Sequence, residues 1–241
     1  MALVLAKSNR RLVPYRKRRR GLMRTNKRFN ASRWIPHVSL CPDRMFVKLK
    51  YSQSFRLSSN NGAITSQVFR ANDIEDCDAT SQGPGPDAYG VASWSIFYGR
   101  FYVTACAIEL KITPNDNGNS KVIVYPTVFN VPPTSLDASA SHARAVQRQI
   151  NGGEGTKSVY RKFSTRAITG EPWNINQTKV LGQQVTVNSQ WYWTIAMAGV
   201  PENTPPIDTG VNCSMTITYN CVFYNRNQVL AGEQGGGGSS S

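Results

Sequence analysis

Basic side chains are concentrated in the first fifth of the chain. Residues 1–50 contain 15 Lys and Arg residues and a single acidic residue, Asp43, whereas the rest of the chain contains 13 basic and 13 acidic residues. The whole formal net charge of +14 therefore belongs to this one segment. Cations at this density repel one another and remain solvated until a polyanion neutralises them. The segment predicts nucleic acid as the partner.

Most of these cations lie close together, between Lys7 and Arg33, with no acidic residue among them. A nuclear-import signal needs a run of only about 5 to 8 basic residues, so we favour nucleic-acid binding, with an import function that overlaps it. Aromatic residues are sparse in the segment, which favours phosphate contacts over base stacking and binding largely independent of base sequence. The candidate nucleic-acid-binding residues are Lys7, Arg10, Arg11, Arg16, Lys17, Arg18, Arg19, Arg20, Arg24, Lys27, Arg28 and Arg33.

A second group of charged residues is acidic and lies farther along the chain. Carboxylates close together on a loop supply the hard oxygen ligands that Ca²⁺ prefers, although this segment lacks the glycine and the final glutamate of an EF-hand. We therefore expect a solvated loop. The alternatives are a cation site between subunits and a partner for an arginine of a neighbouring copy. The residues concerned are Asp73, Glu75, Asp76 and Asp78.

Residue types that perform catalysis are scarce in the sequence. The two histidines, His37 and His142, neighbour no motif of an activated serine or cysteine, and no phosphate-binding glycine loop is present. The five cysteines show no C-x-x-C spacing, which argues against zinc. Cys213 and Cys221 share one expected strand but lie too far apart for a disulfide, so reduced thiols are expected. We predict no enzyme and no cofactor.

The residues after the basic segment show the two-residue period of β-strands. From Met45 to Leu57 most odd positions are apolar, while the even positions include Lys48, Lys50 and Arg56. The segment from Val211 to Phe223 alternates even more cleanly, so each of these segments predicts a long strand with one buried face. Six shorter strands are expected over residues 63–70, 101–112, 121–128, 156–165, about 178–187 and 190–197.

Eight strands joined by long, uneven loops favour an all-β fold, a single jelly-roll sandwich. An immunoglobulin-like sandwich is the competing fold, but its strands are shorter and its Cys-Trp-Cys spacing is absent here. Two short helical segments are expected, 136–149 with Asp137 as its N-cap, and 92–98. No run of about 18 apolar residues occurs, so neither membrane insertion nor secretion is expected.

The charge and the strand pattern divide the chain into three parts. Residues 1–42 form a basic nucleic-acid-binding arm that we expect to be largely disordered, because its charge gives it nothing to pack against. Residues 43–229 form the jelly-roll domain. Residues 230–241 form a flexible Gly/Ser tail, which is either native or an appended linker.

Two stretches of the sequence resemble a known family. The segment Val68-Phe69-Arg70-Ala71-Asn72-Asp73-Ile74 leads into the acidic loop, and Trp94-Ser95-Ile96-Phe97-Tyr98-Gly99-Arg100-Phe101-Tyr102-Val103 enters a strand. Together with the basic arm, this order resembles circovirus-like capsid proteins of circular, replicase-encoding single-stranded DNA (CRESS-DNA) viruses. In that family the acidic loop commonly reads Asp-Pro-Asp, where this chain has Asp76-Cys77-Asp78.

The resemblance implies a homo-oligomer of about 60 copies in a T=1 icosahedral shell around a single-stranded DNA genome, with the arms pointing inward. It implies a virion protein that enters the host nucleus through the nuclear import machinery; no receptor is indicated. Two alternatives stay open: a capsid protein of a small single-stranded RNA virus, and a non-viral nuclear or ribosome-associated nucleic-acid-binding protein. Candidate subunit contacts are the proline-containing loops 84–89 and 201–207.

Overall fold

The computed structural model describes residues 42–80, 85–171, 179–182, 187, 189–200 and 208–227. These ranges contain the acidic loop and most of the expected jelly-roll domain. The candidate nucleic-acid-binding residues of the arm, the Gly/Ser tail and loop 201–207 lie outside them.

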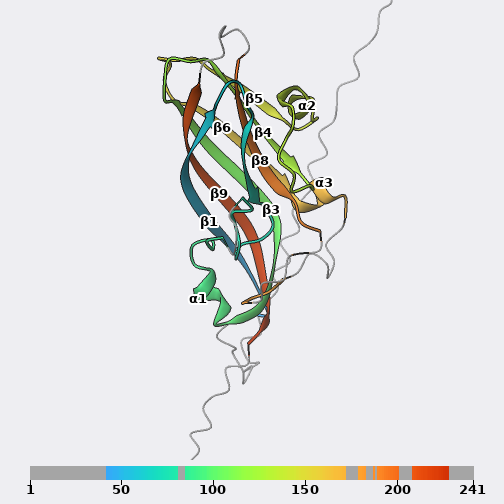
Figure 1. Ribbon diagram of the computed structural model, residues 1–241. Coiled ribbons are helices and arrows are strands. Elements are labelled where there is room, and N and C mark those ends of the chain that lie inside the picture. The colour runs from blue at the N-terminus through green and yellow to red at the C-terminus, as the bar shows by residue number, and fades with distance from the viewer. Residues whose placement is uncertain are drawn as a thin grey trace, which may run out of the picture. The chain divides into compact units, whose positions relative to one another are not determined.

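Two antiparallel sheets form the fold (Figure 1). In the first sheet the strand order is β1 (Arg44–Ser59), β9 (Thr209–Arg226), β3 (Tyr98–Pro114) and β6 (Lys157–Ser164), and the two-residue β7 (Lys179–Val180) also pairs with β3. In the second sheet the order is β2 (Thr65–Arg70), β8 (Tyr192–Gly199), β4 (Ser120–Thr127) and β5 (Val146–Ile150). Apart from β7, four strands belong to each sheet and the chain crosses repeatedly between them. This topology is a jelly roll, which confirms the predicted fold.

The long strands β1 and β9 pair along their whole length, from Arg44 opposite Tyr224 to Ser59 opposite Thr209. The period-two pattern of their sequences is the cause, because it turns one set of side chains toward the second sheet. Trp193 of β8 packs there with residues of the first sheet such as Ile108 and Met215. Each of these three side chains is at most 1% exposed.

Three short helices complete the described structure. They are α1 (Val91–Ser95), α2 (Leu136–Ala140) and α3 (Thr165–Thr169). The expected turn at 92–98 corresponds to α1, but the expected helix over 136–149 is wrong beyond Ala140. The N-cap of α2 is Ser135, whose hydroxyl accepts a hydrogen bond from the Ala138 N–H, and not Asp137.

Two strand predictions also need correction. The segment Val146–Ile150, which we expected to be largely helical, is strand β5 and pairs with β4. The strand expected at 178–187 is reduced to β7, which is followed by a turn at residues 181 and 182. The jelly roll thus has its eight strands, but β5 and not the segment at 178–187 supplies one of them.

Candidate nucleic-acid interface

The structure fixes the point at which the basic arm joins the domain. The Tyr98 hydroxyl donates a hydrogen bond to the Pro42 carbonyl at 2.9 Å, and Asp43 forms an ion pair with Arg226 at 2.7 Å. Tyr98 begins β3 and Arg226 ends β9, so both contacts hold the chain at one end of the first sheet. The arm is therefore attached at the end of the sheet where β1 begins.

The first sheet has one face that carries many exposed cations. Its strand register places Lys50 opposite Thr218, Thr218 opposite Ala107, and Ala107 opposite Lys162, so these four side chains lie on the same side of the sheet. We call this side the open face. Its charged residues are Arg44, Lys48, Lys50 and Arg56 of β1, Arg100, Glu109 and Lys111 of β3, and Lys162 of β6.

Lys48, Lys50 and Arg56 were expected on the polar face of the first strand, and all three are exposed. Sequence reasoning did not single out Arg100, Lys111 or Lys162. The alternation within the segments expected as strands at 101–112 and 156–165 could have identified Lys111 and Lys162, but assigning them to the same face as Lys50 required the strand order.

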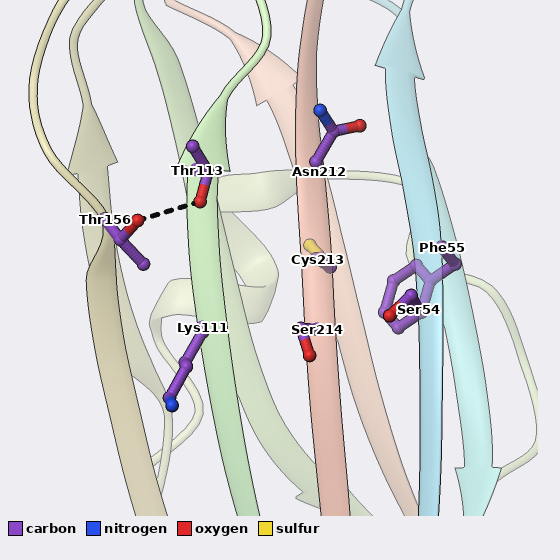
Figure 2. Close-up of a pocket in the computed structure, with 8 residues that line it drawn as sticks. All are labelled: Ser54, Phe55, Lys111, Thr113, Thr156, Asn212, Cys213 and Ser214. Atoms are coloured by element: carbon purple, nitrogen blue, oxygen red, sulfur yellow. Dashed lines mark hydrogen bonds between the residues drawn. The ribbon is translucent and has the colours of Figure 1, made fainter.

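Small polar side chains leave a shallow groove at the end of the open face away from Arg44 (Figure 2). The groove has a volume of about 510 Å³, and Lys111 lies at its edge. Thr113 and Thr156 are hydrogen-bonded through their hydroxyls at 3.0 Å across β3 and the start of β6. The lining residues are Ser54, Phe55, Lys111, Thr113, Thr156, Asn212, Cys213 and Ser214.

The second sheet differs from the first in both charge and cover. On its outer side Ile123 of β4 lies opposite Ala196 of β8, and both residues are fully buried. Helix α2 contacts both strands there. The cation Lys121 on this side pairs with Asp137 of α2 at 3.5 Å. The two outer sides of the sandwich are therefore unequal: one is partly covered by a helix, and the other is open and basic.

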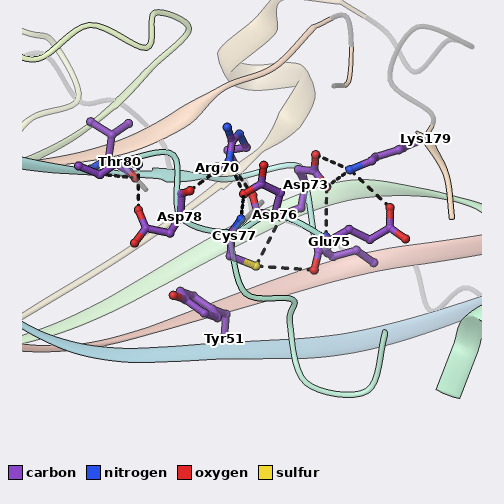
Figure 3. A network of polar contacts seen from close by, with 12 residues as sticks. Tyr51, Arg70, Asp73, Glu75, Asp76, Cys77, Asp78, Thr80 and Lys179 are labelled. Atoms are coloured by element: carbon purple, nitrogen blue, oxygen red, sulfur yellow. Dashed lines mark hydrogen bonds and ion pairs between the residues drawn. The ribbon is translucent and has the colours of Figure 1, made fainter. Parts of the chain in front are cut away.

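The acidic loop after β2 is largely buried, so the expectation of a solvated loop is wrong. Figure 3 shows the polar contacts of its side chains. Asp73 is 1% exposed, and both of its carboxylate oxygens accept hydrogen bonds from the Lys179 ammonium, at 2.9 and 3.0 Å. Glu75 accepts a hydrogen bond from the Gly182 N–H and lies 3.4 Å from the same ammonium. Burial raises the pKa of Asp73, while Lys179 acts in the opposite direction.

The other two carboxylates of the loop have separate partners. Arg70 forms an ion pair with Asp76 at 2.5 Å and donates to the backbone carbonyl of Asp78. The Asp78 side chain accepts hydrogen bonds from the Gln67 amide and from the Thr80 N–H. These contacts make the loop a structural element that joins β2 and β7. Among the described residues, no group of three or more His, Cys, Asp or Glu side chains is placed so that it could hold a metal ion.

The thiols of Cys77, Cys106, Cys213 and Cys221 are free and buried, as expected. Burial raises the pKa of Cys77 to about 12 and that of Cys213 to about 12. Thiols with so high a pKa carry almost no thiolate at neutral pH and are poor nucleophiles.

No family model and no curated protein matches the chain. Several solved structures are similar to it. The empty Turnip yellow mosaic virus shares 12% identity over 78% of this chain and 84% of that one, with a TM-score of 0.42. The decameric BFDV capsid protein shares 10% sequence identity over 75% of this chain and 99% of that one, with a TM-score of 0.41. The structure of Mud crab tombus-like virus shares 10% sequence identity over 94% of this chain and 89% of that one, with a TM-score of 0.43. Similarity at this level does not assign a function to this chain.

Proposed function

We propose that this chain is a viral capsid protein that assembles into a small icosahedral shell and packages single-stranded DNA through its basic arm. The observation that carries the proposal is the combination of a jelly-roll domain with a separate segment, residues 1–42, that holds +12 of the net charge of +14. On this proposal the protein is not an enzyme, it is a component of the virion, and the arm directs it to the host nucleus before assembly.

The charge of the arm supports packaging by many copies together. A single flexible arm binds phosphates only through contacts that salt screens readily. About 60 copies would place on the order of 800 positive charges inside one shell, which matches a genome of roughly one to two thousand nucleotides. Multiplicity therefore turns weak contacts into stable packaging.

Exposed apolar side chains support contacts between copies. Phe129 and Val131, on the loop after β4, are 69% and 62% exposed, and Tyr89, in the loop expected to contact other subunits, is 90% exposed. Ile96, directly after α1, is 62% exposed. Large apolar side chains on loops lose contact with water when subunits pack together, which favours association.

Two other functions remain to be distinguished by experiment. A capsid protein of a single-stranded RNA virus would assemble in the same way but package RNA. A nuclear or ribosome-associated protein would use the same arm as a monomer. Within the described residues, no helix has the length and apolarity needed to span a membrane, which is compatible with all three functions.

The experiment is assembly of the purified full-length protein near physiological salt, followed by sedimentation and negative-stain microscopy. We expect closed particles of uniform size that protect single-stranded DNA from nuclease. Stronger protection of RNA than of DNA would favour the RNA-virus alternative. If monomers or dimers alone sediment, and micrographs show no particles even with nucleic acid added, the capsid proposal is wrong.

A further inference from the structure

The open face carries one sign of charge almost exclusively. It holds seven cations and one carboxylate, Glu109, on one side of the sheet formed by β1, β9, β3 and β6. Soluble proteins usually mix both signs on a surface, which serves solubility equally well. Because residues 43–229 hold 16 basic and 13 acidic residues, this face concentrates cations within a domain that is otherwise close to neutral.

The cations of the open face are not used for structure. Lys48, Lys50, Arg56, Lys111 and Lys162 are exposed and form no ion pair with any described residue. By contrast, the buried Lys179 and the largely buried Arg70 are both paired with carboxylates. The face therefore has free positive charge for a partner outside the domain.

The side chains between these cations suit a phosphate backbone. Short hydroxyl side chains such as Ser52 and Ser54 of the edge strand β1 and Thr216 and Ser214 of the neighbouring strand β9 point outward on this face. Hydroxyl groups donate hydrogen bonds to phosphate oxygens, and their small size allows a chain to lie close to the sheet. The exposed ring of Tyr160, opposite Glu109, offers a surface on which a base can stack.

We propose that the open face binds the phosphate backbone of single-stranded DNA as a second site, separate from the arm, with the groove at Ser54 and Ser214 as its far end. This rests on the proposed function, and it fixes the orientation of the domain: the open face lines the inside of the shell. From Arg44 to Ser54 the strand spans about 33 Å, so the two ends of the face are well separated. The site binds any sequence, because it contacts phosphates.

The test uses the full-length protein at concentrations too low for assembly and a fluorescent oligothymidine as the probe. The face variant Lys50→Gln/Lys111→Gln/Lys162→Gln removes three cations from three strands. The control variant Arg148→Gln/Arg161→Gln/Arg166→Gln removes three exposed cations that do not belong to the open face. Both variants carry the same net charge, so they differ in the position of the lost charges.

Loss of three phosphate contacts should make the plot of log affinity against log salt less steep by about 2 and weaken binding roughly 10- to 100-fold at 0.1 M salt. The control should change affinity by less than about threefold, because salt screens charges that do not contact the DNA. Equal effects of the two variants overturn the proposal. Failure of the wild-type protein to form particles overturns the proposed function, but this comparison of unassembled protein still stands.

A second pair of variants tests the groove. Ser214→Glu places a negative charge in the groove, and Ser214→Gln adds nearly the same volume without the charge. We expect Ser214→Glu to weaken oligothymidine binding clearly more than Ser214→Gln, with both variants keeping the wild-type thermal unfolding temperature. Equal affinities of the two variants show that DNA does not enter the groove and overturn this part of the proposal.

Discussion

Among the ion pairs of the described acidic loop, the one between Lys179 and Asp73 is the most deeply buried, with side chains 4% and 1% exposed. We expect Lys179→Met to destabilise the protein by about 3–5 kcal/mol, because the variant leaves the Asp73 carboxylate buried without a counter-charge. Lys121→Met is the matched control. Its partner Asp137 has a side chain that is 94% exposed, so that loss should cost about 1 kcal/mol or less. Urea unfolding monitored by tryptophan fluorescence measures both.

A double variant separates the ion pair from the packing of the lysine chain. Lys179→Met/Asp73→Leu removes both charges, and replacing both partners of a buried pair by apolar residues is often close to neutral. We expect the double variant to recover much of the stability lost in Lys179→Met. If it is no more stable than the single variant, unpaired charge is not the cause of the loss.

The stability of the loop should also depend on pH through Glu75. Burial raises the pKa of Glu75 above its ordinary value of 4.5, and the Gly182 N–H and Lys179 act in the opposite direction. The folded state then binds the proton more tightly than the unfolded chain, so this contribution to stability is full below the ordinary value and falls as pH rises through the raised pKa. Glu75→Gln lacks this dependence. The free energy of unfolding of Glu75→Gln minus that of the wild type should therefore increase between about pH 4 and pH 7. A difference that stays constant over this range contradicts the prediction.

At the scale of elements, local pattern predicts a strand well where one face is buried and the other is open. The segments at Met45–Leu57 and Val211–Phe223 alternate for that reason, and both are strands over their whole predicted length. In β5 only the two ends, Val146 and Ile150, are buried, while the three residues between them are exposed. This pattern lacks a period of two, and the alanines before it favour a helix locally. Pairing with β4, a contact distant in sequence, decides the outcome.

The prediction that the acidic loop is solvated was wrong for a similar reason. Its carboxylates are close together in sequence, which suggests a solvated or metal-binding loop, but the partner of Asp73 is Lys179, 106 residues away. Nothing in the local sequence indicates that pairing. The positions of charged residues could be predicted, whereas their partners depended on the three-dimensional fold.

The strand assignment of β5 gives a direct prediction. Ile150 is 1% exposed and belongs to the core, so Ile150→Ala should cost about 2–5 kcal/mol through the lost contacts and the cavity. The neighbouring Gln149→Ala is the control. Its side chain is exposed, and its backbone carbonyl still accepts the hydrogen bond from Lys157, so the change should stay within about 0.5 kcal/mol. Similar losses for both variants in urea unfolding would contradict a buried Ile150.

At the scale of the whole molecule, charge is divided between the arm, residues 1–42, which holds +12 of the net charge of +14, and a domain whose two outer sides are unlike. One side of the sandwich is basic and open, and the other is partly covered by α2. On the proposed function, this asymmetry would distinguish the side of the domain that faces the nucleic acid from the side that faces outward. The basic segment was evident from composition, but the direction of the domain required the strand order.

Deletion of residues 1–33 tests how binding is shared between the arm and the domain. The deletion removes twelve basic residues and ends before β1 begins at Arg44, so the thermal unfolding temperature should stay close to that of the wild type. For single-stranded DNA binding, the slope of log affinity against log salt concentration should become less steep by up to about 8, the value for twelve lost phosphate contacts.

A smaller slope should remain in the truncated protein, because the open face keeps its cations. We therefore expect packaged nucleic acid per particle to fall sharply while weak, salt-sensitive binding persists, and Lys50→Gln/Lys111→Gln/Lys162→Gln should remove most of that remainder. An unchanged slope after truncation would show that the arm does not bind the nucleic acid. A slope near zero after truncation would show that the arm binds alone and that the open face takes no part.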